Sequence, residues 1–207
     1  FAWIDRSQPS ADPTPRDPLA LRLALAHPGN KSAYLARPCQ YIDAERSGCA
    51  MRYWTEMRFA PEVIAATNSA LDQIKQRLGA TQLILVGYSG GGAVAALTSV
   101  RRNDVIRLVT VAGNLDHRAW TDYHHIRPLD GSLNPADEIS ALQNLSQLLF
   151  AGGKDRNITP ELVLDFARRF PENMRPVVMI EPDFDHQCCW VNKWYVLWRK
   201  AVNTTAQ

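Results

Sequence analysis

The segment 83–97 constrains the fold of this chain more than any other part of the sequence. In it, a cluster of glycines joins two apolar runs. The run 83–86 predicts a buried strand, and the alanine-rich run 92–97 predicts a helix. Between them stands Gly87-Tyr88-Ser89-Gly90-Gly91, which allows a sharp turn. A strand that turns directly into a helix predicts a parallel sheet covered by helices. Ser89 then stands clear of the backbone at the apex, as a nucleophilic serine must.

Two later loops offer the acid and the base that such a serine requires. Asp155 follows the apolar run 147–151, and His186 follows the apolar run 177–180 one strand–helix unit further on. The carboxyl ends of parallel strands meet at one edge of a sheet. We therefore expect Ser89, Asp155 and His186 to lie together as a catalytic triad.

Other assignments of these groups stay open. Asp116 follows the predicted strand 108–112 and is the best substitute for the orienting acid. Asp183 and Asp185 lie too near the histidine in sequence to orient it easily from another loop. The plainer alternatives are that Asp155 is only an acid at a helix start and that the histidine is an ordinary surface residue.

Seven short segments, spread over nearly the whole chain, resemble those of a group of small bacterial serine hydrolases with the α/β-hydrolase fold. They are P-C-Q-Y at 38–41, W-T at 54–55, R-F-x-P-E-V at 58–63, G-Y-S-G-G at 87–91, A-G-N-L-D at 112–116, S-L-N-P at 132–135 and D-H-x-C-C-W at 185–190. The resemblance implies a mostly parallel sheet with helices on both faces. With the triad it favours ester hydrolysis through an acyl-enzyme. A thioesterase, a peptidase and a non-catalytic envelope binding module are the alternatives.

Acyl transfer also requires backbone N–H groups that bind the oxyanion. The N–H of Gly90, the residue after the predicted nucleophile, is one expected donor. The second is expected from the loop that contains Phe1 and Ala2. We predict Trp3 and Tyr88 as walls of the substrate pocket.

The strand that would lead into the second oxyanion loop is missing from the sequence. In the fold that this chain resembles, it lies between the predicted strand 32–37 and the strand 82–86. A parallel sheet that loses a central strand leaves two rows of unpaired backbone groups. The sequence also begins with Phe1 rather than Met. We therefore expect the natural protein to extend upstream of Phe1 by at least one strand.

Length and apolar content agree with a single domain over 1–207, since 46% of the residues are hydrophobic. Periodic apolar residues predict a helix over 61–78. Asp17 as cap and Pro18 at the first turn predict a helix from 19 to 26, and an aromatic helix is expected around 190–198. The long connection 114–144, rich in aromatic residues and proline, is predicted to be an irregular lid or substrate-binding insertion. A plain surface excursion is the alternative.

Charge and spacing exclude several classes of partner. The 23 basic and 21 acidic residues nearly balance, and no basic block with interleaved aromatic residues predicts nucleic-acid binding. No apolar run approaches the roughly 20 residues of a membrane span. The histidines lack metal-ligand spacing, so neither a metal nor another cofactor is predicted. The expected partner is a small-molecule or acyl-bearing substrate.

The four cysteines form two pairs in the sequence. Cys39 and Cys49 flank a polar stretch and are predicted to form a disulfide. Cys188 and Cys189 are adjacent, and they form either a vicinal bridge or two free thiols; buried thiols are the alternative for both pairs. Disulfides are typical of exported proteins. With the resemblance, this predicts a periplasmic or envelope-associated bacterial protein, with a lipid anchor upstream of Phe1.

Overall fold

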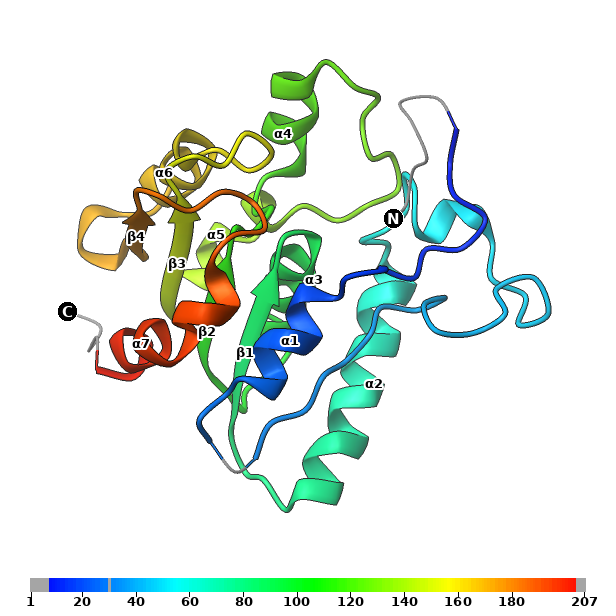
Figure 1. Cartoon of the computed structure of the whole chain (residues 1–207), viewed down its shortest axis with the longest axis horizontal. Coiled ribbons are helices and arrows are strands. Elements are labelled where there is room, and N and C mark those ends of the chain that lie inside the picture. The colour runs from blue at the N-terminus through cyan, green and yellow to red at the C-terminus, as the bar shows by residue number, and fades with distance from the viewer. Residues whose placement is uncertain (1–7, 30, 204–207) are drawn as a thin grey trace.

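A computed structural model of the chain describes residues 8–29 and 31–203. Four parallel strands form one sheet in the order β1-β2-β3-β4, so that each crossover moves the chain to the adjacent position (Figure 1). The strands are β1 (Leu83–Tyr88), β2 (Val105–Val111), β3 (Ser146–Gly152) and β4 (Val177–Glu181). Parallel neighbours require a connection across the sheet, and helices supply it at every step.

Helices cover both faces of this sheet. Figure 1 shows α1 and α7 in front of the sheet and α3 behind it, with α2 packed on α3. The α-helices are α1 (Leu19–Leu25), α2 (Pro61–Leu78), α3 (Gly90–Ser99), α4 (His117–His124), α5 (Ile139–Leu142), α6 (Pro160–Arg168) and α7 (Trp190–Asn203). Short 3-10 helices cover Met51–Tyr53, Pro135–Asp137 and Glu172–Met174. No described helix is long and apolar enough to cross a bilayer.

Alternate side chains of β3 enter two separate cores. Leu148 and Phe150 pack with α1 and with Trp194 of α7 on one face. Leu149 and Ala151 pack with α3 and α6 on the other face. Successive side chains of a strand point to opposite faces, so a strand buried on both sides is a continuous apolar run. The predicted sheet with helices on both faces is therefore confirmed.

Most of the predicted elements are present with small shifts at their ends. The helix 61–78 is confirmed at both limits, and Gly79 ends it with a φ of 57°, a left-handed conformation that favours glycine. The helix α1 starts one residue after Pro18, and no side chain caps it. Asp17 pairs with Arg22 instead.

The predicted strand 32–37 is wrong, because this stretch has no regular secondary structure. A strand exists through backbone hydrogen bonds to a neighbour, and the described part of the chain offers none beside 32–37. In the described sheet β1 lies at an edge. Val86, in the middle of that strand, is 39% exposed, whereas β3 is almost fully buried.

The segment that precedes α2 is held by a disulfide and by side-chain contacts, not by strand pairing. The disulfide between Cys39 and Cys49 is present, with Cα atoms 5.7 Å apart. Trp54 packs on this disulfide, and its indole N–H donates to the carbonyl of Ser10 at 2.8 Å. The irregular chain is thereby anchored at two points that are far apart in sequence.

The connection 114–144 is more regular than predicted, since it contains α4, a 3-10 helix and α5. It is also bonded to the segment before α2. The hydroxyl of Ser132 accepts from the N–H of Phe59 and donates to the carbonyl of Glu56. The N–H of Leu133 donates to the carbonyl of Phe59. The insertion therefore forms part of the packed structure beside the carboxyl end of the sheet.

Candidate active site

Ser89 occupies the turn between β1 and α3 with φ 52° and ψ −125°. For a residue other than glycine, such a conformation costs about 1–3 kcal/mol and persists only where the surroundings hold it. Three backbone hydrogen bonds do so here. The N–H of Ser89 donates to the carbonyl of Val111, and its carbonyl accepts from Gly92 and Asn114. The strained serine is therefore fixed to β2 and to the first turn of α3.

Two glycines make this turn sterically feasible. A Cβ on Gly87 would lie 2.4 Å from the carbonyl oxygen of Gly91, and a Cβ on Gly92 would lie 2.8 Å from Cα of Gly113. A side chain at either position would push α3 away from the strands. The glycine spacing in the sequence therefore has a steric cause, the close approach of helix and sheet at the serine.

Gly90, the residue after this serine, is the first residue of α3. Its N–H has no intrahelical acceptor, and it belongs to the end of the helix that carries partial positive charge. It therefore suits the role of oxyanion donor. Phe1 and Ala2, expected to provide the second donor, and Trp3, expected in the pocket wall, lie outside the described residues.

His186 connects the serine to a carboxylate. Its Nε2 lies 3.0 Å from Oγ of Ser89, and its Nδ1 lies 2.8 Å from Oδ2 of Asp155. An ionised carboxylate only accepts hydrogen bonds, so the imidazole proton belongs on Nδ1 and the lone pair of Nε2 faces the serine hydroxyl. The structure thus brings the three residues together in one hydrogen-bonded chain.

Asp155 is buried and held by its own loop. Its Oδ1 accepts from the N–H groups of Asn157 at 2.8 Å and Ile158 at 3.0 Å, which leaves Oδ2 for the imidazole. The loops after β3 and β4 are also bonded to each other, since the N–H of Lys154 donates to the carbonyl of Phe184. Backbone hydrogen bonds therefore set the separation between acid and base.

Tyr88 supports the histidine from the side of β1. Its hydroxyl donates to the carbonyl of His186 at 3.0 Å, and the two ring centroids are 5.2 Å apart. Burial, with a smaller contribution from the charge of Asp155, raises the pKa of Tyr88, so its hydroxyl stays protonated and able to donate. The structure places Tyr88 beside the histidine; its part in a pocket wall stays a prediction.

Asp116, the alternative acid, is engaged elsewhere. It caps α4 by accepting from the N–H groups of Arg118 and Ala119. Its Oδ1 also accepts from the amide of Asn134, and its Oδ2 lies 2.6 Å from Nη2 of Arg169. These contacts give Asp116 a structural task at the start of the insertion.

The loop that carries His186 is stabilised by hydrogen bonds and a disulfide of the residues next to it in sequence. Oδ1 of Asp185 accepts from the N–H groups of Gln187 and Cys188. Cys188 and Cys189 form a vicinal disulfide, which is one of the two alternatives left open by the sequence. The indole N–H of Trp190 donates to the carbonyl of Asp185. Asp185 therefore shapes this loop and does not orient the imidazole.

Asn157 is a site residue that the sequence did not reveal. Its Nδ2 lies 3.0 Å from Nε2 of His186. Its Oδ1 accepts from the indole of Trp120, and its carbonyl lies 2.8 Å from Nε2 of His124. Asn157 thus links the insertion 114–144 to the histidine. The only signal in the sequence is a polar residue two positions after the acid.

Arg37 is a further residue near the serine that the sequence did not single out, and Arg58 is a second arginine near Arg37. Nη1 of Arg37 lies 3.5 Å from the position that a Cβ on Gly90 would occupy, and the ring of Phe59 lies equally close to it. Burial lowers the pKa of both guanidinium groups, and the charge of Arg37 helps to bring the pKa of Arg58 down to about 10. The two cations are therefore close enough to repel each other.

Comparison with known proteins identifies the fold. No family model and no curated protein sequence matches the chain. Among solved structures, it is similar to Est1E from Butyrivibrio proteoclasticus with bound ferulic acid, at 11% identity and a TM-score of 0.57 over 70% of this chain and 68% of that one. The α/β hydrolase MGS-MChE2, from the metagenome of Mar Chica lagoon sediments in Morocco, has 18% identity and a TM-score of 0.50 over 68% and 71%.

The esterase Pf2001 from Pyrococcus furiosus has 14% identity and a TM-score of 0.53 over 68% of this chain. The chain spans only 59% of the length of that esterase. At these identities the likeness concerns the fold alone. The chain has the α/β-hydrolase fold, with a described sheet of four parallel strands.

Proposed function

We propose that this protein is a serine hydrolase that cleaves carboxylic esters through an acyl-enzyme. Ser89 is the nucleophile, His186 the general base and Asp155 the acid that orients it. The observation that carries this proposal is the hydrogen-bonded chain from the hydroxyl of a strained serine, through an imidazole, to a buried carboxylate. The esterases with a similar fold support it.

The first half of the reaction forms the acyl-enzyme. Nε2 of His186 takes the hydroxyl proton while Oγ of Ser89 attacks the ester carbonyl. The imidazolium that results is stabilised by the carboxylate of Asp155, 2.8 Å from Nδ1. The carbonyl oxygen becomes an oxyanion beside the N–H of Gly90, and one such donor contributes about 3–4 kcal/mol to transition-state stabilisation. When the intermediate collapses, the C–O bond to the alcohol breaks and His186 returns the proton to the leaving oxygen.

The second half releases the acid. A water molecule loses its proton to His186 and attacks the acyl carbon, and the second tetrahedral intermediate expels Oγ of Ser89, which regains its proton. The same steps serve thioesters and peptides, since their carbonyls pass through equivalent intermediates. Substrate choice belongs to the pocket, for which we propose Trp3, Tyr88 and the insertion 114–144.

We further propose that the protein acts in the periplasm or at the bacterial envelope, with a lipid anchor upstream of Phe1. The disulfides Cys39–Cys49 and Cys188–Cys189 support an oxidising compartment. Fractionation of the natural protein tests this location: recovery in the cytoplasmic fraction would contradict it.

Labelling with a neutral fluorophosphonate probe tests the hydrolase proposal. We expect the folded protein to react at neutral pH, and Ser89→Ala and His186→Ala to lose the label. Ser99→Ala is the matched control, because Ser99 lies on α3 with its hydroxyl bonded to the carbonyl of Ala95, and it should label normally. A folded protein that does not react, or a label that survives in Ser89→Ala, would contradict the proposal.

A further inference from the structure

Arg37 lies against Gly90, next to the proposed nucleophile, and its charge acts on Arg58. Neither guanidinium forms an ion pair with a carboxylate among residues 8–29 and 31–203. Arg58 donates through Nε to the carbonyl of Thr55 at 2.6 Å. The acid nearest to it in sequence, Glu56, accepts from the hydroxyl of Thr55 and forms no ion pair in the described structure, and its charge offsets only part of the effect of Arg37 on Arg58. The outer nitrogens of Arg58 and the guanidinium of Arg37 therefore remain available to a ligand.

Arg102 is a largely buried arginine with a structural role, and it shows how this protein compensates such a charge. Its side chain is 9% exposed and forms ion pairs with Asp72 and Asp104, both at 2.8 Å. A shielded cation without such compensation is costly, and two neighbouring cations add their repulsion. Arg37 and Arg58 are half-buried and form no ion pair of this kind in the described structure, so their charges are less compensated than that of Arg102. A bound anion would offset that cost.

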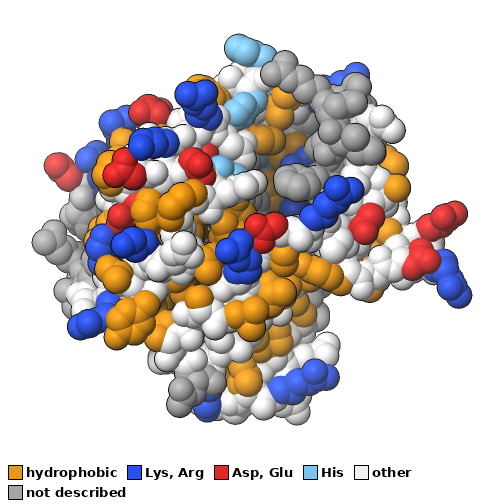
Figure 2. Space-filling model, in the orientation of Figure 1, with side chains coloured by type: hydrophobic (Ala, Val, Ile, Leu, Met, Phe, Trp, Pro, Cys, Tyr) orange, Lys and Arg blue, Asp and Glu red, His pale blue; other side chains and the backbone are white. Residues whose placement is uncertain are grey.

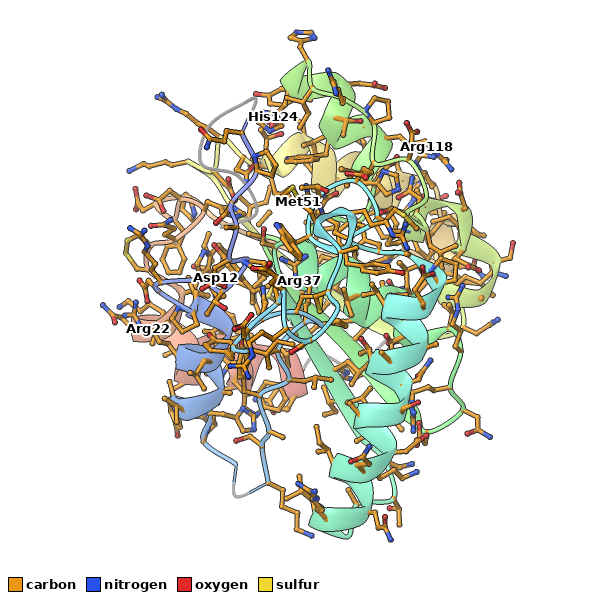
Figure 3. The ribbon with its side chains drawn as sticks, turned by 90° about the vertical axis from the view of Figure 1, so that its right-hand side faces the viewer. Asp12, Arg22, Arg37, Met51, Arg118 and His124 are labelled. Carbon is orange, nitrogen blue, oxygen red and sulfur yellow. A yellow bond between two sulfur atoms is a disulfide. The ribbon has the colours of Figure 1, made fainter. Side chains whose placement is uncertain are left out.

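The figures show where Arg37 lies in the molecule. Figure 3 shows Arg37 in the middle of the molecule, near the upper ends of the strands, whereas Arg22 and Arg118 lie toward the outside. Figure 2 shows a hollow on one face with hydrophobic and histidine side chains around it. A cation beside apolar groups, as Arg37 is beside Gly90 and Phe59, attracts an anionic group more strongly than one in open water.

The backbone of both arginines is held by contacts that exist before any ligand binds. The backbone N–H of Arg37 donates to the side chain of Gln40, whose own N–H donates back to the carbonyl of Arg37. Cys39, one residue before this glutamine, is fixed by its disulfide. Arg58 precedes Phe59, which is fully buried and bonded to the insertion. Such preorganisation lowers the entropic cost of binding.

We propose that the substrate of this hydrolase carries an anionic oxygen group, a carboxylate or a phosphate, that Arg37 and Arg58 bind next to Ser89. This inference rests on the proposed hydrolase function and adds the substrate class. The planar guanidinium fork pairs with two oxygens at once, which orients the substrate as well as holding it. The ester carbonyl then lies on the side of Gly90, within reach of the nucleophile.

Matched pairs of esters test the proposal. The mono-para-nitrophenyl esters of glutaric and adipic acid differ from the corresponding pentanoate and hexanoate esters by a terminal carboxylate in place of a methyl group. After subtraction of spontaneous hydrolysis, we expect kcat/KM to be higher for the anionic member of a pair. A hydrogen bond to a charged group contributes about 1.5–3 kcal/mol, so the ratio should be about 10 to 100.

The readout for the variants is this ratio of anionic to neutral kcat/KM. In Arg37→Gln and Arg58→Gln we expect it to fall by about tenfold or more. Arg52→Gln is the matched control, because Arg52 lies on the same stretch of chain but stacks on Tyr53, and it should keep the wild-type ratio. An equal loss on both esters in Arg37→Gln would overturn the proposal in favour of a role at the oxyanion.

Direct binding separates the two anion types and needs no turnover. Calorimetry on Ser89→Ala should detect glutarate or inorganic phosphate, and the signal should disappear in Ser89→Ala/Arg37→Gln. The anion that binds identifies the group; absence of both would overturn the inference. If the serine reacts with the neutral fluorophosphonate probe and the ester ratio is near one, the anion site fails and the hydrolase stands. No labelling of the folded protein means that the hydrolase proposal itself fails.

Discussion

The two ends of the sheet use charged side chains in opposite ways. At the amino end, Asp104 before β2 lies 2.5 Å from Lys75 and 2.8 Å from Arg102, which also contacts Asp72. At the carboxyl end, Arg37 and its neighbour Arg58 form no ion pair with a carboxylate among the described residues. Paired charges stabilise the fold, whereas charges left without partners are available for a ligand.

The same contrast holds for the acids. Hydrogen bonds from Arg102, together with Lys75, hold the pKa of Asp104 well below its usual range, so that carboxylate is committed to the fold. Asp155, at the other end of the sheet, uses one oxygen for its own loop and reserves the other for His186. Substitutions at the carboxyl end should therefore change activity, and substitutions at the amino end should change stability.

The largest expected effect is the loss of the nucleophile. Ser89→Ala should lower kcat by about 10⁴- to 10⁶-fold, as in other enzymes whose triad acts as a unit. Relief of backbone strain does not accompany this change, because alanine adopts the same φ at similar cost, so the melting temperature should stay close to wild type. Steady-state kinetics and thermal melts check both points. A strongly destabilised Ser89→Ala would contradict the expectation that substitutions at the carboxyl end change activity and not stability.

Asp155→Asn should have the next largest effect. An amide can place its N–H toward Nδ1, which favours the tautomer with the proton on Nε2 and removes the lone pair that faces Ser89. We expect kcat to fall by about 10⁴-fold. Asp183→Asn is the matched control, since Asp183 pairs with Lys154 on the surface, and its kcat should be unchanged. Retention of activity in Asp155→Asn would contradict the assigned acid.

Removing the disulfide in Cys39→Ala/Cys49→Ala should affect stability and site together. A bridge that closes a loop of this length contributes about 2–3 kcal/mol to the free energy of unfolding. Because Arg37 lies only two residues before Cys39, the anionic preference in kcat/KM should fall as well. Denaturant unfolding and the matched esters measure the two effects. A loss of stability with an unchanged ester ratio would show that the position of Arg37 does not depend on the disulfide.

Asp104→Asn should lower the free energy of unfolding by about 1–2 kcal/mol, since two charge-assisted contacts are lost at a site near the surface. The kcat/KM should not change. Equilibrium unfolding and kinetics on the same preparation test this separation of the two ends. A large loss of activity at wild-type stability would contradict it.

The stability difference between wild type and Asp104→Asn depends on pH, because the pKa of Asp104 is lowered in the folded protein. A carboxylate whose pKa is depressed in the folded state contributes its stability above the unfolded value of about 4 and loses it as the pH falls through the folded pKa. The gap in stability between wild type and Asp104→Asn should therefore be constant near neutral pH and shrink below about pH 4. A gap that widens on acidification would contradict the ion pairs.

The elbow and the triad loops could be predicted because their signals are local. Gly87 and Gly92 mark the close contact of helix and sheet, and the apolar runs before Asp155 and His186 mark the strand ends. Parallel topology alone then places those ends on one edge. The strand 32–37 could not be judged in the same way, because a strand depends on a partner that local sequence does not contain.

The sequence by itself determined the strand–turn–helix around Ser89, the two loops that hold the acid and the base, and the order of the units, because turn residues and periodicity act over a few positions. Only the tertiary structure decided that Asn157 meets His186 and that Arg37 lies beside Gly90. Those contacts join irregular segments that are far apart in the chain. Their positions follow from packing and hydrogen bonds of the whole molecule, which no local pattern encodes.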